Sequence, residues 1–180
     1  MKTLLTKLFS ALILMTAIQA PAHSQTVFVQ MYGQTESGCN VGPGSVEIYY
    51  SSPTIRTSNS DFGFGGINNV ISGASSETVD FQCSTGSSVS ISMDNGGIDD
   101  LTIGALPAQI VYGYRIYTGE NPWDGVVAVG RFSDGPATFV STGEKTNLQV
   151  IGVLVSPTGK SFAGQQSFGS IAMLNFSFTD

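Results

Sequence analysis

The chain has 180 residues and a formal net charge of -6, with seven Lys and Arg against thirteen Asp and Glu. Charged residues make up only 11% of it, against about 25% in ordinary globular proteins. This length fits one domain. With no basic cluster in the sequence, nucleic-acid binding and attraction to anionic membranes are disfavoured.

The first 24 residues have the pattern of an export signal. Lys2 and Lys7 precede an apolar run from Leu8 to Ile18, and the small residues of Ala22-His23-Ser24 are typical of a signal-peptidase site. A run of 11 residues is too short to span a bilayer, which takes about 20. We therefore expect residues 1–24 to be removed, without membrane insertion, leaving Gln25 first.

Beyond the signal, apolar side chains alternate with a period of two, which predicts strands rather than helices. In chain order, the expected strands are 27–32, Val46 to Tyr50, Thr78 to Cys83, Ser88 to Met93, Ile110 to Tyr117, Val126 to Phe132, Leu148 to Val155 and Ile171 to Phe178. Segments rich in Gly, Ser, Asn and Asp separate them, among them Ser58 to Gly66, which we expect to be a turn. Eight short strands predict an all-β sandwich or barrel.

The last of these strands has a strongly apolar face and lies close to residue 180. If its neighbouring strand is missing, an apolar groove and unpaired backbone groups are left open. The alternating side chains that would line the groove are Ala172, Leu174, Phe176 and Phe178. An ordinary core edge strand would show the same alternation.

The first predicted strand is a candidate to fill such a groove, in its own molecule or in a neighbour. Its filling side chains would be Val27, Val29 and Met31. A slip of one residue would reverse the face and present Phe28 instead.

Cys39 and Cys83 are the only cysteines, and export would bring them to an oxidising compartment. A single disulfide is the economical interpretation, with two free thiols as the alternative. With 44 residues of separation, the chain-entropy model gives a stabilisation of roughly 4 kcal/mol.

Catalysis is disfavoured by the residues that export would leave. His23, the only histidine, departs with the signal, which excludes Ser-His-Asp and Cys-His mechanisms and removes the commonest metal ligand. Thirteen acidic residues make some carboxylate pair inevitable, but none stands in a recognisable glycosidase motif. We expect no enzyme activity and no cofactor.

Two loop regions have open alternatives. Trp123, among polar neighbours, would either pack at the edge of a sandwich, which we favour, or stack on a sugar. The oxygen-bearing side chains around a glycine pair would either form a calcium site or a solvated turn. These are Asp94, Asn95, Asp99 and Asp100, and because their spacing does not match an EF-hand we favour the turn and expect no metal.

Several motifs follow one another in a characteristic order along residues 25–180. They are Gly38-Cys39-Asn40-Val41, Asp61-Phe62-Gly63, Val79-Asp80-Phe81-Gln82-Cys83, Ser90 to Gly97, the tyrosine-rich Ile110 to Tyr117, Trp123 with Gly125, Leu148 to Gly152, and Leu174 to Phe178. Together they resemble the spore coat protein U domain of archaic (Csu-like) chaperone-usher pilus subunits. The resemblance implies an incomplete immunoglobulin-like β-sandwich that is completed by a donor strand from a neighbouring subunit.

The resemblance also implies a division of the chain and a set of partners. Residues 1–24 would be the signal peptide, 25–36 the donor strand segment and 37–180 the sandwich domain. The protein would be a structural subunit of a surface pilus that polymerises by donor-strand exchange and supports adhesion or biofilm formation. Its partners would be a periplasmic pilus chaperone, an outer-membrane usher and neighbouring subunits. It would pass through the periplasm to the cell surface.

On this resemblance the donor side chains are Val27, Val29 and Met31, and the residues of the acceptor groove and chaperone contact are Ala172, Leu174, Phe176 and Phe178. One departure stands out. Phe168 and Ser170 occur where the family usually has a tyrosine and an aspartate, which puts any hydrogen bond from that aspartate in question.

Other functions remain open. The chain would instead be a secreted monomeric or fibre-tip binding module, adhesin or lectin-like, if residues 26–32 complete their own sandwich. A spore or outer-coat structural protein would share the same fold.

Overall fold

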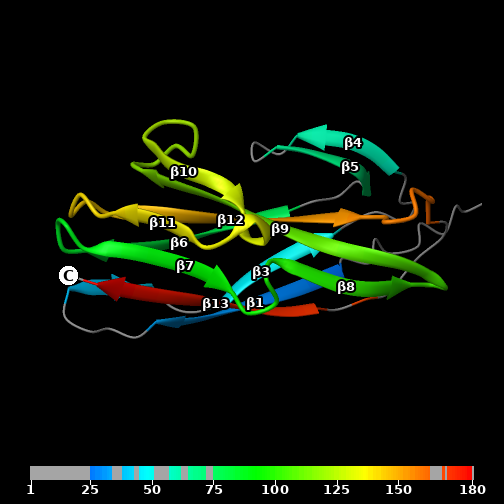
Figure 1. The fold of residues 1–180 in the computed structure, drawn as a ribbon, viewed down its shortest axis with the longest axis horizontal. Helices are drawn as coiled ribbons and strands as arrows, with labels where there is room; N and C mark the ends of the chain where they lie inside the picture. The colour runs from blue at the N-terminus through cyan, green and yellow to red at the C-terminus, as the bar shows by residue number, and fades with distance from the viewer. Residues whose placement is uncertain are drawn as a thin grey trace, which may run out of the picture.

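The computed structural model describes residues 25–33, 38–42, 45–50, 57–61, 65–71, 75–162, 168 and 170–179. The predicted signal, residues 1–24, lies outside them. Within these ranges the chain is all-β, with strands β1 to β13 and a single short 3-10 turn, η1 (Phe132–Asp134). Its curled sheets pack as in a β-sandwich (Figure 1). In this described part, no helix is long and apolar enough to cross a membrane.

One sheet has five strands, and β1 lies inside it rather than at an edge. Neighbouring strands are antiparallel except for the pair of β1 and β13, which is parallel. The order across the sheet is β11 (Ala137–Val140), β7 (Ser88–Met93), β13 (Ser170–Thr179), β1 (Gln25–Gly33) and β3 (Ser45–Tyr50).

The other sheet has eight strands, organised around the two longest, β9 (Leu106–Thr118) and β12 (Thr146–Val155), which pair antiparallel. The remaining strands flank this pair. On the β9 side lie β8 (Ile98–Ile103) and β10 (Val126–Arg131); on the β12 side lie β6 (Ser75–Cys83) with β2 (Cys39–Val41), and β5 (Gly66–Ile71) with β4 (Thr57–Asp61).

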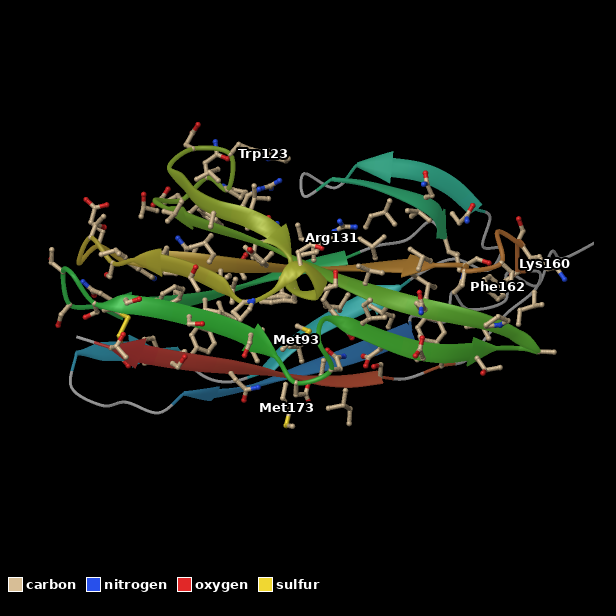
Figure 2. The ribbon with its side chains drawn as sticks, in the orientation of Figure 1. Met93, Trp123, Arg131, Lys160, Phe162 and Met173 are labelled. Carbon is tan, nitrogen blue, oxygen red and sulfur yellow. A yellow bond between two sulfur atoms is a disulfide. The ribbon has the colours of Figure 1, made fainter. Side chains whose placement is uncertain are left out.

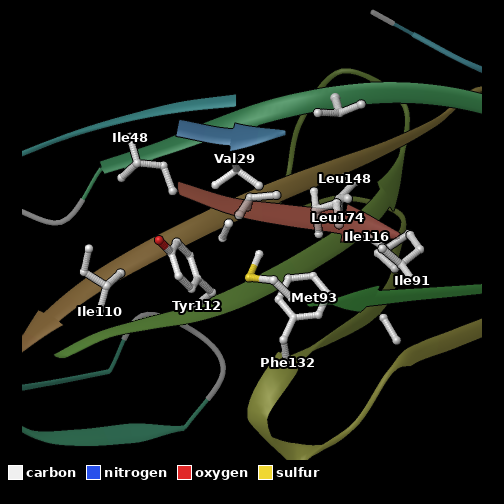
Figure 3. Packing of buried hydrophobic residues seen from close by; sticks show 14 of the residues in the cluster. Val29, Ile48, Ile91, Met93, Ile110, Tyr112, Ile116, Phe132, Leu148 and Leu174 are labelled. Carbon is white, nitrogen blue, oxygen red and sulfur yellow. The ribbon is translucent and has the colours of Figure 1, made fainter. Parts of the chain in front are cut away.

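The main core fills the space between the two sheets, because alternate residues of each strand face inward. Figure 3 shows side chains of both sheets meeting there. The largest fully buried ones include Tyr112, Ile48, Ile91, Ile110, Ile116, Leu148, Leu174 and Val29. Each aliphatic side chain of this kind contributes roughly 1.5 to 3 kcal/mol when it is buried.

A second, smaller core lies on the outer face of the eight-stranded sheet. The hairpin of β4 and β5 folds over this face (Figure 1), and its Ile67 and Val70 cover apolar residues of β9 and β12. The covered residues are Val111, Ile151, Val153 and Val155. β12 is therefore buried on both faces along this stretch.

The eight predicted strands are confirmed, with differences at their ends. Phe132 does not end β10 but begins η1. The expectation of a turn over Ser58 to Gly66 is wrong, because β4 occupies Thr57–Asp61 and pairs with β5. β4 has no apolar residue, so its pairing, not its pattern, makes it a strand. β2, β5, β8 and β11 were also not predicted.

Candidate strand-exchange site

β13 presents the apolar face that the sequence predicted. Ala172 and Leu174 are 0% exposed and Phe176 is buried, whereas Ile171 on the opposite face is 64% exposed. Phe178 is half-buried and packs against the main core. The inward face of β13 is therefore part of the sandwich interior.

β1 lies in its own chain between β13 and β3. Val29 is in register with Ala172 on one side and Val46 on the other, and its side chain is 0% exposed. Figure 3 shows Val29 and Leu174 within the same packed cluster. Of the two places that the sequence left open for this segment, the single chain adopts the internal one.

The register of β1 within the single chain shows which of its two faces is turned toward the core. Phe28 pairs with the exposed Ile171, while Val29 pairs with the buried Ala172, so the described register is the one that buries Val29. The backbones of Val27 and Met31 are in register with Ser170 and Leu174. Their side chains lie outside the described residues, and their role as donor side chains stays a prediction.

Aromatic side chains close the far end of this face. The ring of Phe176 meets Phe81 of β6 edge-on at a centroid distance of 5.7 Å and stacks with Phe178 at 6.2 Å. Phe81 in turn contacts Phe139 of β11 at 5.9 Å. These contacts tie the end of β13 to both sheets, and such pairs contribute about 0.5 to 1.5 kcal/mol beyond their buried area.

The beginning of β13 is held by two carboxylates, Asp94 in the turn between β7 and β8 and Asp99 in β8 itself. Asp94 Oδ1 accepts the backbone N–H of Met173 at 2.9 Å. Asp99 Oδ2 accepts the hydroxyls of Ser170 and of Tyr112, the latter at 2.8 Å. Ser170 thus makes a hydrogen bond at the position where the family was expected to supply one from an aspartate. No sequence signal linked Asp99 to Ser170, which lie 71 residues apart.

The same carboxylates were the calcium alternative. Asp99 Oδ1 also accepts Asn95 Nδ2 at 2.5 Å, and Asp100 Oδ1 accepts Gln109 Nε2 at 2.7 Å. Protein donors therefore already occupy both carboxylate oxygens of Asp99 and one oxygen each of Asp94 and Asp100. Among the described residues there is no group of three or more His, Cys, Asp or Glu side chains that could hold a metal ion.

The predicted disulfide between Cys39 and Cys83 is confirmed, and it joins directly opposite residues of β2 and β6. Both cysteines are buried. Gly38, just before the bridge, accepts the backbone N–H of Ser84 at 2.7 Å. The chain that follows β1 is thus anchored to the eight-stranded sheet, within a few residues of Gly33.

Trp123 does not pack at the sandwich edge as we favoured. It is 70% exposed, and the guanidinium carbon of Arg115 lies 3.8 Å from its ring centroid. Trp123 lies in the loop between β9 and β10, which Figure 2 shows at the outer margin of the molecule.

A scan against protein-family models gives no match, and no curated protein matches the chain. The resemblance to the spore coat protein U domain therefore stays a prediction.

Proposed function

We propose that the protein is a structural subunit of a surface fibre and that it polymerises by exchanging β1 between neighbouring copies. The observation that carries the proposal is the place of β1, which lies between β13 and β3. Within the described strands, β13 and β3 pair with β1 and not with each other. Withdrawal of β1 would open the groove of a pilin-like subunit.

Exchange would conserve the contacts seen within one chain. A neighbour's β1 has the same sequence, so it would bury the same Val29 against Ala172 and restore both ladders. Exchange of an identical element between copies is a low-cost route to oligomers. Only residues 34–37 separate Gly33 from Gly38, and short hinges favour swapping over folding back.

The disulfide and the carboxylates near β13 would keep the rest of the sandwich together when β1 is withdrawn. The disulfide holds β2 to β6, so departure of β1 would not unravel the chain beyond it. Asp94, directly after β7, and Asp99, on β8 of the other sheet, hold the beginning of β13. In the proposed assembly, a periplasmic chaperone would fill the groove first, an outer-membrane usher would exchange it for the next subunit's β1, and no catalytic residue is needed.

The alternative is a secreted monomeric binding module, and the internal pairing of β1 favours it. In that case β1 never leaves its own sandwich, and the groove is never open. Both readings require residues 25–33 for stability, so they differ in which molecule supplies the strand.

Size-exclusion chromatography with mass detection separates the two. Oxidised residues 25–180 would be compared with a chain that starts at Ser37, with and without a peptide of residues 25–36. We expect long oligomers from the first, and from the second an unstable protein that the peptide converts to a discrete monomer. Stable monomers from both chains, indifferent to the peptide, would refute the proposed polymerisation.

A further inference from the structure

The loop between β9 and β10 presents the only tryptophan of the sequence to solvent. A single exposed apolar residue is ordinary on a protein surface. Trp123 is unusual because one face of its ring packs on the guanidinium of Arg115. Arg115 is itself only 4% exposed, and it donates a hydrogen bond to Gln149 Oε1 at 3.2 Å. One face of the indole is therefore held by Arg115, and the other face is open to solvent.

Hydrogen bonds hold the whole loop in one shape. Asn121 Oδ1 accepts the backbone N–H of Trp123 at 3.1 Å, and Asn121 Nδ2 donates to Asp124 Oδ2 at 2.7 Å. The loop closes where Thr118 N–H donates to the carbonyl of Gly125 at 3.0 Å. Gly125 has a φ of 63°, and a side chain there would meet the Thr118 carbonyl at 2.7 Å. A platform fixed before binding loses little conformational entropy when a ligand arrives.

Polar groups lie on the same loop and on the strand beside it. A shallow depression of about 390 Å³ is lined by Gly119, Glu120, Lys145 and Asn147. Asn147 Nδ2 donates to the carbonyl of Gly119 at 2.7 Å, which fixes this wall of the depression to the loop. Carboxylate, ammonium and amide groups are the partners that sugar hydroxyls need.

We propose that the loop Gly119–Gly125 binds neutral glycans, with a pyranose ring stacked on the open face of Trp123. The C–H groups of a pyranose suit the electron-rich face of an indole. Glu120 and Asp124 are exposed beside the platform, and the chain is acidic overall, so uronic acids and other anionic sugars are disfavoured. This binding is independent of whether β1 exchanges between copies.

The test uses the emission of Trp123, which reports on this loop alone because the chain has no other tryptophan. The chain of residues 25–180 is titrated with cellohexaose, chitohexaose and mannohexaose, and with an oligogalacturonate of the same length. We expect a saturable blue shift with at least one neutral hexasaccharide and about tenfold or more weaker binding of the oligogalacturonate.

Calorimetry then compares variants, since Trp123→Ala removes the optical signal. Trp123→Ala should weaken binding about tenfold or more, and Trp123→Phe by less. Val140→Ala is the matched control, because Val140 is 62% exposed on the other sheet, and it should bind as the native chain does. The proposal is overturned if no neutral hexasaccharide binds at roughly 10 mM, if the acidic one binds best, or if Trp123→Ala binds unchanged.

Discussion

The two flanks of β13 differ in what holds them. On the β7 side the ladder is antiparallel, and Asp94, directly after β7, accepts a further hydrogen bond from the backbone of Met173. Asp99, on β8 of the opposite sheet, accepts the hydroxyl of Ser170. On the β1 side the ladder is parallel, a slightly weaker arrangement per residue, and the partner strand belongs to the start of the described chain. In the proposed assembly, the strand on the β7 side stays in place and the strand on the β1 side is the one that is exchanged. The proposal therefore requires the sandwich to lose and regain a strand on the β1 side of β13 only.

The largest loss of stability is expected from a charge in β1, the neighbour of β13 that the proposal exchanges. Val29→Asp would place a carboxylate at a position that is 0% exposed, which should lower the free energy of unfolding by more than about 4 kcal/mol and abolish oligomers. Urea unfolding and size-exclusion chromatography measure the two effects. Ile171→Asp, on the exposed face of β13, is the control and should change little. Normal assembly of Val29→Asp would show that β1 does not fill the groove.

The anchor behind β1 comes next. Replacing both Cys39 and Cys83 by serine should reduce stability by roughly 4 kcal/mol, since it frees a loop with 44 residues of separation in the unfolded chain. Thermal and urea unfolding of oxidised native protein and the double variant give the difference. Reduction of the native protein should reproduce it. An unchanged unfolding midpoint would show that the disulfide does not anchor the chain that follows β1.

The attachment of the beginning of β13 to the opposite sheet is tested by Asp99→Asn, which keeps the shape and removes the charge that accepts the hydroxyls of Tyr112 and Ser170. Hydrogen bonds to a charged group contribute about 1.5 to 3 kcal/mol, and we expect a loss in this range. Hydrogen exchange should accelerate at the beginning of β13. Asp100→Asn is the matched control, because Asp100 accepts only an exposed bond from Gln109 in the described structure. Equal losses from both variants would contradict the special role of Asp99.

The smallest effect lies away from both flanks. A hydrogen bond from Lys145, aided by its charge, holds the pKa of Asp80 below its ordinary value of 3.8, although partial desolvation opposes the shift. A lowered folded-state pKa stabilises above the unfolded value, and that contribution disappears as the pH falls through the folded pKa. The pair is exposed, so Lys145→Ala should cost under about 1 kcal/mol at pH 7 and less at pH 2. Urea unfolding at both pH values measures this, and a difference that persists undiminished in acid would contradict the assignment.

Alternation predicted the long strands because their side chains divide between core and solvent. It could not predict β4, whose sequence has no apolar residue, or β8, where Asp99 and Asp100 interrupt the pattern. The inward face of β13 followed from alternation as well. The link from Asp99 to Ser170 and the stack of Arg115 on Trp123 depend on which strands become neighbours, and that is decided by the packing of the whole sandwich.

The central claim is that β1 of one copy lies beside β13 of another. Gln30 and Met173 are in register across this pair, so chains carrying Gln30→Cys can be refolded together with chains carrying Met173→Cys and then oxidised. Exchange predicts disulfide-linked pairs of the two chains on a non-reducing gel, and none when Val140→Cys replaces Met173→Cys. The opposite result is that the mixture gives no linked pairs, while a chain with both Gln30→Cys and Met173→Cys forms only an intramolecular disulfide. β1 would then pair with β13 of its own chain, and the proposed fibre would be contradicted.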